Sequence, residues 1–512
     1  MPRGLLVVVA LIVVSAFITP FHRELYVGDE TKYSQVVREM RDGAFFLPTL
    51  HGTPFTHKPP LHFWIVDLLT YPLGAYSLWS YVLPSLIAFA ALLWTLWRMN
   101  GPAVGPLAAF ICGTSLMIWG SAQTARMDVS FTALLVAAAW LLRRFLDGGP
   151  GRALVFSGVL TGLATLVKGP MAPVIMMALF LFEKLRRKRV PSGPYVVAVA
   201  VMAIIPLLWF VPAMMLGGDS YTREVLVKQT AGRAVGAWVH RAAPWYYLTH
   251  APGDLFPWLP LLVVAVIAVF KRRIEAAKFE VSWILAVLIP YSLLSSKLDV
   301  YMMTLIPPVA IVIARFVSDA TADRWTRWGW RANVFVLGLL FGIAAAALTV
   351  LPRNLKAEDR ALAELPAVRG FFVVLGVSAL AALVYSIRVR DLRTSTIAVG
   401  LVPMIAFGYA AVALVPIANE IASTRPLVRA IVKQDVRAEQ VALFTSPHLW
   451  TRDMPRALER VTYVNAETLR GIRPELIVTS RRYAKDIATV LAEYRKVDEF
   501  RMIGKPFDVY RR

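Results

Sequence analysis

Long apolar runs recur along most of the chain, and they restrict its fold more than any other feature of the sequence. Each run has roughly 17–22 residues, the length that an α-helix needs to cross about 30 Å of hydrocarbon. A soluble fold would have to bury these helices although they are apolar on every side. The sequence therefore predicts an all-α polytopic membrane protein.

The apolar runs predict about 13 membrane-spanning helices. The predicted spans are residues 4–20, 79–98, 103–121, 128–146, 153–167, 170–183, 194–216, 255–270, 281–295, 299–317, 332–351, 369–387 and 396–416. The first run follows Arg3 and resembles a signal peptide in length and charge. Because it lacks a small-x-small cleavage site before Pro20, we interpret it as an uncleaved first span.

Basic residues, which give the chain a formal net charge of +22, concentrate in short loops between the predicted spans. The most basic of these loops are residues 183–191, 271–278 and 388–393. Short basic loops are retained in the cytoplasm, so the charge pattern indicates membrane topology rather than nucleic-acid binding. On this topology, residues 21–78, residues 217–254 and the C-terminal tail lie on the opposite, periplasm-like side.

The apolar stretch Leu61–Leu73 does not fit this topology as a full span. The N-terminus and Arg98 are both expected on the cytoplasmic side. One crossing at residues 4–20 and one back at 79–98 already connect them, so a further full crossing between these two spans is not possible. We therefore expect a helix that lies in the membrane interface. A helical hairpin within residues 61–98 is the competing interpretation, and it would invert the topology of everything that follows.

The chain changes character after residue 417, because no later apolar run reaches spanning length. The pattern predicts strands near residues 441–445, 460–464, 475–479 and 507–511 and a helix at 483–494. We therefore predict a multi-span domain at 1–417, with a catalytic loop at 21–78, and a small periplasmic α/β domain at 418–512. The α/β domain is expected either to cap the membrane domain or to contact headgroups.

Charged residues stand at the outer ends of several predicted spans, where burial near hydrocarbon is costly and usually marks function. They are Asp29, Glu30, Lys58, Arg126, Asp128, Lys168, Lys297 and Asp299. A carboxylate can take a proton from an acceptor hydroxyl, and fixed cations can offset charge on a leaving phosphate. These residues predict an outward-facing site for an anionic lipid, although an ion-coupled transporter would carry similar charges.

Six short motifs occur in a fixed order along residues 5–317. They are GDETKY at 28–33, GTPFTHKPPL at 52–61, ARMD at 125–128, LVKGP at 166–170, HRAAPWYY at 240–247 and SSKLDVY at 295–301. Each motif alone is weakly specific, but the ordered set resembles the bacterial aminoarabinose transferase family. That family belongs with the protein mannosyltransferases among the multi-span, GT-C type glycosyltransferases.

The resemblance implies an inverting glycosyltransferase of the bacterial inner membrane, with its active site facing the periplasm. Its expected partners are an undecaprenyl-phosphate or other polyprenyl-phosphate sugar donor and lipid A, or another envelope glycolipid or protein, as acceptor. A protein O-mannosyltransferase is a second interpretation. A transporter or lipid flippase is a third, but it predicts internal repeats, which the sequence lacks.

The resemblance also assigns roles to single residues. The expected catalytic acids are Asp29, Asp128 and Glu30; the expected phosphate-binding cations are Lys58, Lys168, Arg241 and Lys297; the expected substrate-lining residues are Tyr33, Tyr246, Tyr247 and Tyr301. Each assignment has a structural alternative: an acid can cap a helix, a lysine can extend to the interface, and tyrosines can form an aromatic belt.

The residue before Lys58 departs from the family pattern. Members of the family carry an acid there, which together with a later histidine can hold a structural zinc ion. This chain has His57, and the later histidine is His240. Two imidazoles are an incomplete zinc site, so we expect no required cofactor and regard a structural zinc at His57 and His240 as the open possibility.

Overall fold

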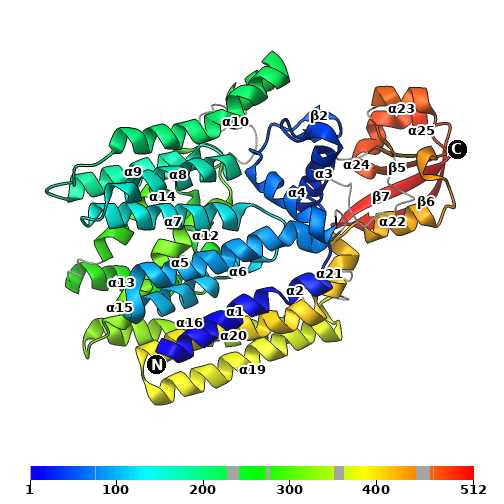
Figure 1. Ribbon diagram of the computed structural model, residues 1–512. Helices are drawn as coiled ribbons and strands as arrows, with labels where there is room; N and C mark the ends of the chain where they lie inside the picture. Colours follow the sequence, from blue (N-terminus) through cyan, green and yellow to red (C-terminus); the bar gives the residue numbers. More distant parts are fainter. Residues whose placement is uncertain are drawn as a thin grey trace.

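The computed structural model describes residues 2–74, 77–227, 241–272, 277–350, 362–444, 462–464 and 466–512. Long helices lie side by side in a bundle, and a small α/β domain lies at one end of it, next to the short elements of the first loop (Figure 1). The helices of the bundle are α1 (Pro2–Ala16), α2 (Thr19–His22), α5 (Leu78–Gly113), α6 (Leu116–Ala122), α7 (Asp128–Leu146), α8 (Gly151–Lys168), α9 (Met171–Arg186), α10 (Tyr195–Arg223), α12 (Tyr246–Asp254), α13 (Leu259–Arg272), α14 (Lys278–Leu293), the 3₁₀ helix η4 (Asp299–Leu305), α15 (Ile306–Ser318), α16 (Arg324–Thr349), α19 (Pro366–Val389) and α20 (Leu392–Ala413).

The predicted all-α membrane architecture is confirmed. Every predicted span falls on one of these helices or on two consecutive ones. Among the described residues, nine helices are long and apolar enough to cross a membrane, or ten when the bent pair of α12 and α13 counts as one span. This number is below the predicted one because α5 joins two predicted spans at Gly101, whose φ of 70° is not helical, and because α9 and α14 have only 16 residues each.

Helices α8 and α10 approach each other closely through two glycines spaced one turn apart. A Cβ atom on Gly158 would lie 2.3 Å from the carbonyl oxygen of Ala198, and one on Gly162 would lie 3.1 Å from that of Met202. Small residues at this spacing let two helix backbones pack against each other in a membrane. The contact matters for function because α8 ends at Lys168 and α10 carries the wall of a cavity described below.

We expect Gly158→Ala to destabilise the protein by about 1–3 kcal/mol, because the new methyl group forces α8 and α10 apart. Thermal unfolding in detergent micelles measures the change. Gly338→Ala in α16 is the matched control, because a Cβ there meets no atom within 4 Å. Equal stability of the two variants would contradict the proposed close packing.

The helix predicted in the interface is α4 (Leu61–Leu73), and it is too short to cross a membrane. Its 13 residues span about 20 Å. His62, Phe63 and Val66 are buried, whereas Leu68 and Tyr71 are largely exposed. The helix therefore has exposed apolar side chains, and its place in the membrane interface stays a prediction.

The C-terminal domain contains a five-stranded mixed sheet with the order β4-β3-β5-β7-β6. Its elements are α21 (Val415–Ala422), α22 (Arg425–Val432), β3 (Val441–Phe444), β4 (Thr462–Tyr463), α23 (Ala466–Ile472), β5 (Leu476–Ser480), α24 (Arg481–Ala484), α25 (Ala488–Leu491), β6 (Arg495–Met502) and β7 (Lys505–Arg511). Strand β3 is parallel to β4 and β5, and β7 is antiparallel to β5 and β6. The predicted strands overlap β3, β4, β5 and β7, whereas β6 was missed.

The segment just before the GDETKY motif is bound to the junction between the bundle and the C-terminal domain. We call this set of contacts the strap, formed by residues 22–27 with residues 419–427. The Val27 N–H donates to the Ala422 carbonyl at 2.9 Å, and the Val27 side chain packs against the core of the C-terminal domain. Asn419 accepts from the Glu24 N–H at 3.1 Å and donates to the His22 carbonyl at 2.7 Å. Arg425 forms an ion pair with Glu24.

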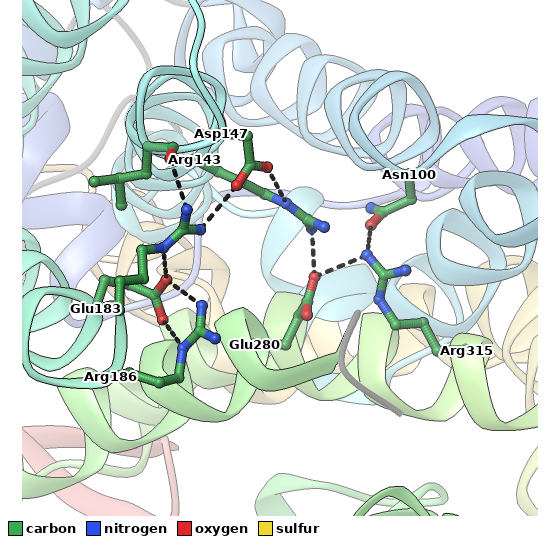
Figure 2. Close-up of polar contacts among 9 residues, drawn as sticks. Asn100, Arg143, Asp147, Glu183, Arg186, Glu280 and Arg315 are labelled. Carbon is green, nitrogen blue, oxygen red and sulfur yellow. Dashed lines mark hydrogen bonds and ion pairs between the residues drawn. The ribbon is translucent and has the colours of Figure 1, made fainter. Parts of the chain in front are cut away.

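A cluster of buried charges lies where several helices of the bundle end (Figure 2). The Glu280 carboxylate of α14 is fully buried and accepts from Arg143 of α7 at 2.7 Å and from Arg315 of α15 at 3.1 Å. Glu183 of α9 pairs with Arg186 and Arg187. Because its members come from α7, α9, α14 and α15, the cluster fixes the ends of these helices relative to one another.

Candidate functional site

Two of the predicted acids meet at one arginine. Asp29 is the first residue of α3 (Asp29–Glu39), and Asp128 is the first residue of α7. The Arg126 guanidinium lies between them, with Nη2 at 3.2 Å from Asp29 Oδ2 and Nε at 3.1 Å from Asp128 Oδ2. Arg126 therefore links the first loop to the start of a long bundle helix.

Three lysines complete this charged group. Lys32 Nζ lies 2.7 Å from Asp29 Oδ1, and Lys168 Nζ lies 2.5 Å from Asp128 Oδ1. Lys58 interacts electrostatically with both Asp29 and Asp128. The structure thus brings together Asp29, Asp128, Lys58 and Lys168, four residues that the sequence predicted for one site.

The electrostatics of this group keep Asp29 ionised. Burial raises the pKa of the Asp29 carboxyl, but Lys32, Arg126 and Lys58 lower it by more, so that the pKa lies below its usual value. The side chain of Asp29 keeps 33% of its exposure, whereas that of Asp128 keeps 5%. Asp29 is therefore the carboxylate that an incoming molecule can reach.

A cavity of about 530 Å³ opens beside the charged group. Lys58 and Lys168 line it together with Tyr291 and Tyr301, whose rings stack at 4.9 Å, and Lys168 Nζ lies 5.2 Å from the Tyr301 ring. Much of the remaining lining is apolar and comes from α10 (Pro206, Leu207, Trp209, Phe210 and Tyr221) and from Val225 and Leu226, which follow it. A cavity that combines two cations with an apolar lining suits a phosphate that is attached to a long lipid chain.

Glu30 locks the first loop to the segment before Asp128. Its Oε2 accepts from Arg23 at 2.5 Å and from the Tyr26 N–H at 2.8 Å, and its Oε1 accepts from the Ala125 N–H at 2.7 Å. Glu30 is also buried, with 5% exposure. This geometry does not support the expected catalytic role of Glu30 and favours a positioning role.

Glu39, at the other end of α3, holds the hairpin that leads to Lys58. Its carboxylate accepts from the Thr49 hydroxyl at 2.5 Å, from the His51 N–H at 2.7 Å and from the Gly52 N–H at 3.1 Å. The hairpin consists of β1 (Thr49–Leu50) and β2 (Thr53–Pro54). Helix α3 therefore carries Asp29 at its start and fixes the approach to Lys58 at its end.

Several predicted site residues do not line the cavity. Lys297 is buried, and its Nζ donates to the carbonyl of Ser292 near the end of α14, at 2.9 Å, and to that of Leu294 just after the helix. Lys297 does not line the cavity and is therefore not placed to bind a donor phosphate. Arg241 is exposed and pairs through its backbone with Ser296. Tyr33 is buried in the core, with its ring edge-on to Phe63 at 5.4 Å.

The other predicted tyrosines differ in position. Tyr301 lines the cavity, as predicted. Tyr246 and Tyr247 are not among the cavity residues and form an edge-to-face pair at 5.2 Å next to it. The Tyr246 hydroxyl donates to Asp299 Oδ1 at 2.7 Å.

The sequence did not single out Lys32 and His62, and it named Arg126 only as a charged residue at the outer end of a span, without a role in the site. Lys32 stands one helical turn after Asp29, and Arg126 belongs to the ARMD motif, so both had a local signal. His62 is 2% exposed, and burial lowers the pKa of its imidazole to about 4, although the Asp128 carboxylate acts in the opposite direction. A neutral histidine therefore lies behind the charged group.

The possible zinc ligands are only partly described. His57 lines the cavity, whereas His240 lies outside the described residues. Within the described part of the chain, no group of three or more histidine, cysteine, aspartate or glutamate side chains is placed to hold a metal ion.

The sequence is similar to one known protein family and to individual bacterial transferases. Residues 57–210 match the family described as dolichyl-phosphate-mannose-protein mannosyltransferase. An undecaprenyl phosphate-alpha-4-amino-4-deoxy-L-arabinose arabinosyl transferase of Pectobacterium atrosepticum is 28% identical over 347 residues, which are 64% of this chain and 61% of that protein. The corresponding protein of Serratia proteamaculans is 26% identical over 368 residues, 68% of this chain and 65% of its own length. The matches thus cover less than two thirds of the length of these relatives.

Solved structures share the fold. The crystal structure of ArnT from Cupriavidus metallidurans bound to undecaprenyl phosphate has a TM-score of 0.75 and 17% identity, and the match covers 99% of this chain and 98% of ArnT. The arabinosyltransferase EmbB from Mycobacterium smegmatis has a TM-score of 0.50 and 14% identity, over 83% of this chain and 42% of EmbB.

These likenesses define a multi-pass membrane protein with the fold of the GT-C glycosyltransferases. Within that class, the chain resembles the aminoarabinose transferases in both sequence and fold, which confirms the resemblance predicted from the six motifs.

Proposed function

We propose that this protein is an inverting glycosyltransferase of the bacterial inner membrane. It moves a sugar from a polyprenyl-phosphate donor to lipid A or another envelope acceptor at the periplasmic face. One observation carries the proposal: Lys58 and Lys168 line an amphipathic cavity, and both interact with the acids of the charged group, Asp29 or Asp128. The names of the relatives, which describe aminoarabinose transfer from undecaprenyl phosphate, support it.

In the proposed reaction, Lys58 and Lys168 bind the donor phosphate, and the lipid chain lies along α10. The bond between the anomeric carbon and the phosphate oxygen breaks, and its electron pair stays on the phosphate, where the two lysines offset the added charge. The acceptor oxygen bonds to the anomeric carbon from the opposite face. Asp29 takes the proton from the acceptor, because it is ionised and accessible.

Asp128 and Arg126 position the reacting groups in this proposal. Both oxygens of Asp128 are held, one by Lys168 and the other by Arg126, and its side chain is nearly inaccessible. Asp128 therefore keeps Lys168 directed at the cavity. Arg126 holds Asp29 at a fixed distance from that pair.

The charge distribution of the bundle supports a periplasmic site. Helix α7 begins at Asp128 and ends with Arg143 and Arg144 in its last turn, and α9 has Lys184 and Arg186 in its last turn. The catalytic group thus lies at the opposite helix ends from the basic loops that stay in the cytoplasm. We accordingly propose residues 1–417 as the transferase domain and 418–512 as a periplasmic domain.

The proposed function is tested with the purified protein in lipid vesicles, a panel of polyprenyl-phosphate sugars, and lipid A or an acceptor peptide. Mass spectrometry identifies the product. We expect transfer to lipid A. Transfer only to the peptide would point to a protein O-glycosyltransferase, and no transfer from any donor would overturn the proposal.

We expect Lys58→Ala to lower kcat/KM for the donor more than tenfold, because a charge-assisted contact to phosphate contributes about 1.5–3 kcal/mol. Initial rates at several donor concentrations measure the loss. Lys184→Ala removes an exposed lysine near the other end of the bundle and is the matched control. An unchanged kcat/KM in Lys58→Ala would remove Lys58 from the phosphate site.

A further inference from the structure

A second cavity, of about 440 Å³, lies between α9 and α10, which are neighbours in the bundle (Figure 1). On α9 its lining runs from Met176 to Lys184 in the last turn, and on α10 it runs from Tyr195, the first residue, to Met202. These helix ends are the ones farthest from Lys168 and the charged group. The volume of the cavity is within the range of ligand sites, roughly 300–1,000 Å³.

An aromatic contact closes the cavity at the start of α10. The Tyr195 ring lies edge-on to Phe145 of α7 at 5.7 Å and tilted against Phe180 of α9 at 5.6 Å. The Tyr195 hydroxyl donates to the Pro191 carbonyl in the segment that connects α9 to α10. Residues 190–192 of this connecting segment also line the cavity. The cavity therefore has a fixed floor formed by three rings and a short loop.

The side of the cavity is open. Met177 of α9 and Val199 of α10 both line it, and they are 48% and 47% exposed. The next residues outward on α10 are apolar and exposed as well, among them Val196 and Val197. In a protein that spans a membrane, the molecules next to such an opening are lipid chains.

The lining offers a water molecule few partners. The Ser157 hydroxyl donates to the Ala138 carbonyl at 2.9 Å, and the Thr161 hydroxyl donates to the Ser157 carbonyl at 2.7 Å. The rest of the lining along α8 and α10, including Leu154, is largely apolar. Water in a cavity needs two to four polar partners, so an acyl chain is the better occupant.

Unpaired cations lie at the end of this cavity. Lys184 lines it, and Lys188 and Arg189 stand exposed in the segment that connects α9 to α10. Among the described residues, none of these three cations forms an ion pair with an acid, whereas the neighbouring Arg187 pairs with Glu183. Charge-assisted hydrogen bonds from lysine and arginine suit a phosphate oxygen. Basic pockets between membrane helices on the cytoplasmic side bind anionic headgroups.

We propose that this cavity binds one acyl chain of an anionic phospholipid, whose phosphate lies at Lys184. The lipid fills the space between α9 and α10 and so holds α10, the helix that also lines the donor cavity, against the bundle. The proposed orientation of the protein assigns this lipid to the cytoplasmic leaflet. The binding itself does not depend on the proposed transfer reaction.

Native mass spectrometry of the full-length protein in detergent tests the proposal, with phosphatidylglycerol and phosphatidylcholine of identical acyl chains as probes. We expect phosphatidylglycerol to be retained and to bind about tenfold more tightly than phosphatidylcholine. Lys184→Gln should weaken phosphatidylglycerol binding about tenfold, the effect of losing one charge-assisted contact, and should leave phosphatidylcholine binding unchanged. Lys271→Gln, at an exposed lysine of another basic loop, is the matched control.

Equal binding of the two phospholipids, or an equal loss in Lys184→Gln and Lys271→Gln, would overturn the proposal. Val199→Trp tests the acyl part, because the indole ring fills the cavity; we expect this variant to lose the lipid and the rise in unfolding temperature that phosphatidylglycerol gives the unsubstituted protein. A competing occupant is the chain of the donor, since Thr161 and Thr165, one turn apart on α8, line the two cavities. Displacement of phosphatidylglycerol by polyprenyl phosphate, one molecule for one, would assign the cavity to the donor instead. Because no turnover is measured, a failure of the proposed function would leave these results unaffected.

Discussion

Asp29→Asn is expected to lower kcat about 10²–10⁴-fold while changing the KM for the donor little, because the amide cannot take the acceptor proton. The phosphate contacts of Lys58 and Lys168 remain in this variant. Since the pKa of Asp29 is already below its usual value, the carboxylate is fully ionised at neutral pH. Activity that depends on this carboxylate should therefore not rise between pH 6 and pH 8, and it should fall only as the pH drops toward the lowered pKa.

Initial-rate measurements over a range of pH test this expectation. Asp42→Asn is the matched control, because Asp42 lies in the same loop but is exposed. A variant of Asp29 that transferred sugar at the rate of the unsubstituted protein would show that another group takes the proton, with Asp128 as the next candidate.

Glu280→Gln is expected to destabilise the protein by about 3–5 kcal/mol, because it removes the fully buried carboxylate that Arg143 and Arg315 share and leaves Arg143 only the longer contact with Asp147 at 3.6 Å. Figure 2 shows both arginines directed at the one carboxylate. The cluster lies far along the helices from the catalytic group, so the variant should keep its kcat at temperatures where it remains folded. Thermal unfolding in detergent and activity after heating measure the two effects.

Asp147→Asn is the control within the same cluster. Asp147 pairs with Arg187 at 2.8 Å, but its side chain is 51% exposed, so its loss should cost about 1 kcal/mol or less. If Glu280→Gln and Asp147→Asn destabilised the protein equally, burial of the Glu280 ion pairs would not determine how much they contribute to stability.

Features that depend on local sequence were predictable. Apolar runs located the helices, and the stretch Leu61–Leu73, which the alternation of crossings predicted not to be a full span, forms a helix of only 13 residues. Strand β6 was missed because its residues, from Arg495 to Met502, include charges at most positions and lack an apolar alternation. It is an edge strand, which tolerates charge because only one of its sides pairs with the sheet.

Within the site, sequence found the residues whose position follows from the end of a helix. Asp29, Asp128 and Lys168 each begin or end a helix, and the three ends meet. Lys297 also stands at the end of a predicted span, but its side chain is directed toward the end of α14. The sequence pattern does not determine in which direction a single side chain points.

The strap has a consequence for the order of events during biosynthesis. The backbone just before Asp29 is held by Asn419, Ala422 and Arg425, which the ribosome adds about 400 residues later. A nascent chain that has inserted every span up to α20 thus already contains Asp29, Asp128 and both cavity lysines, yet Asp29 has no fixed place. Competence for transfer is expected to appear only once the last domain has folded, which protects the donor pool from half-made enzyme.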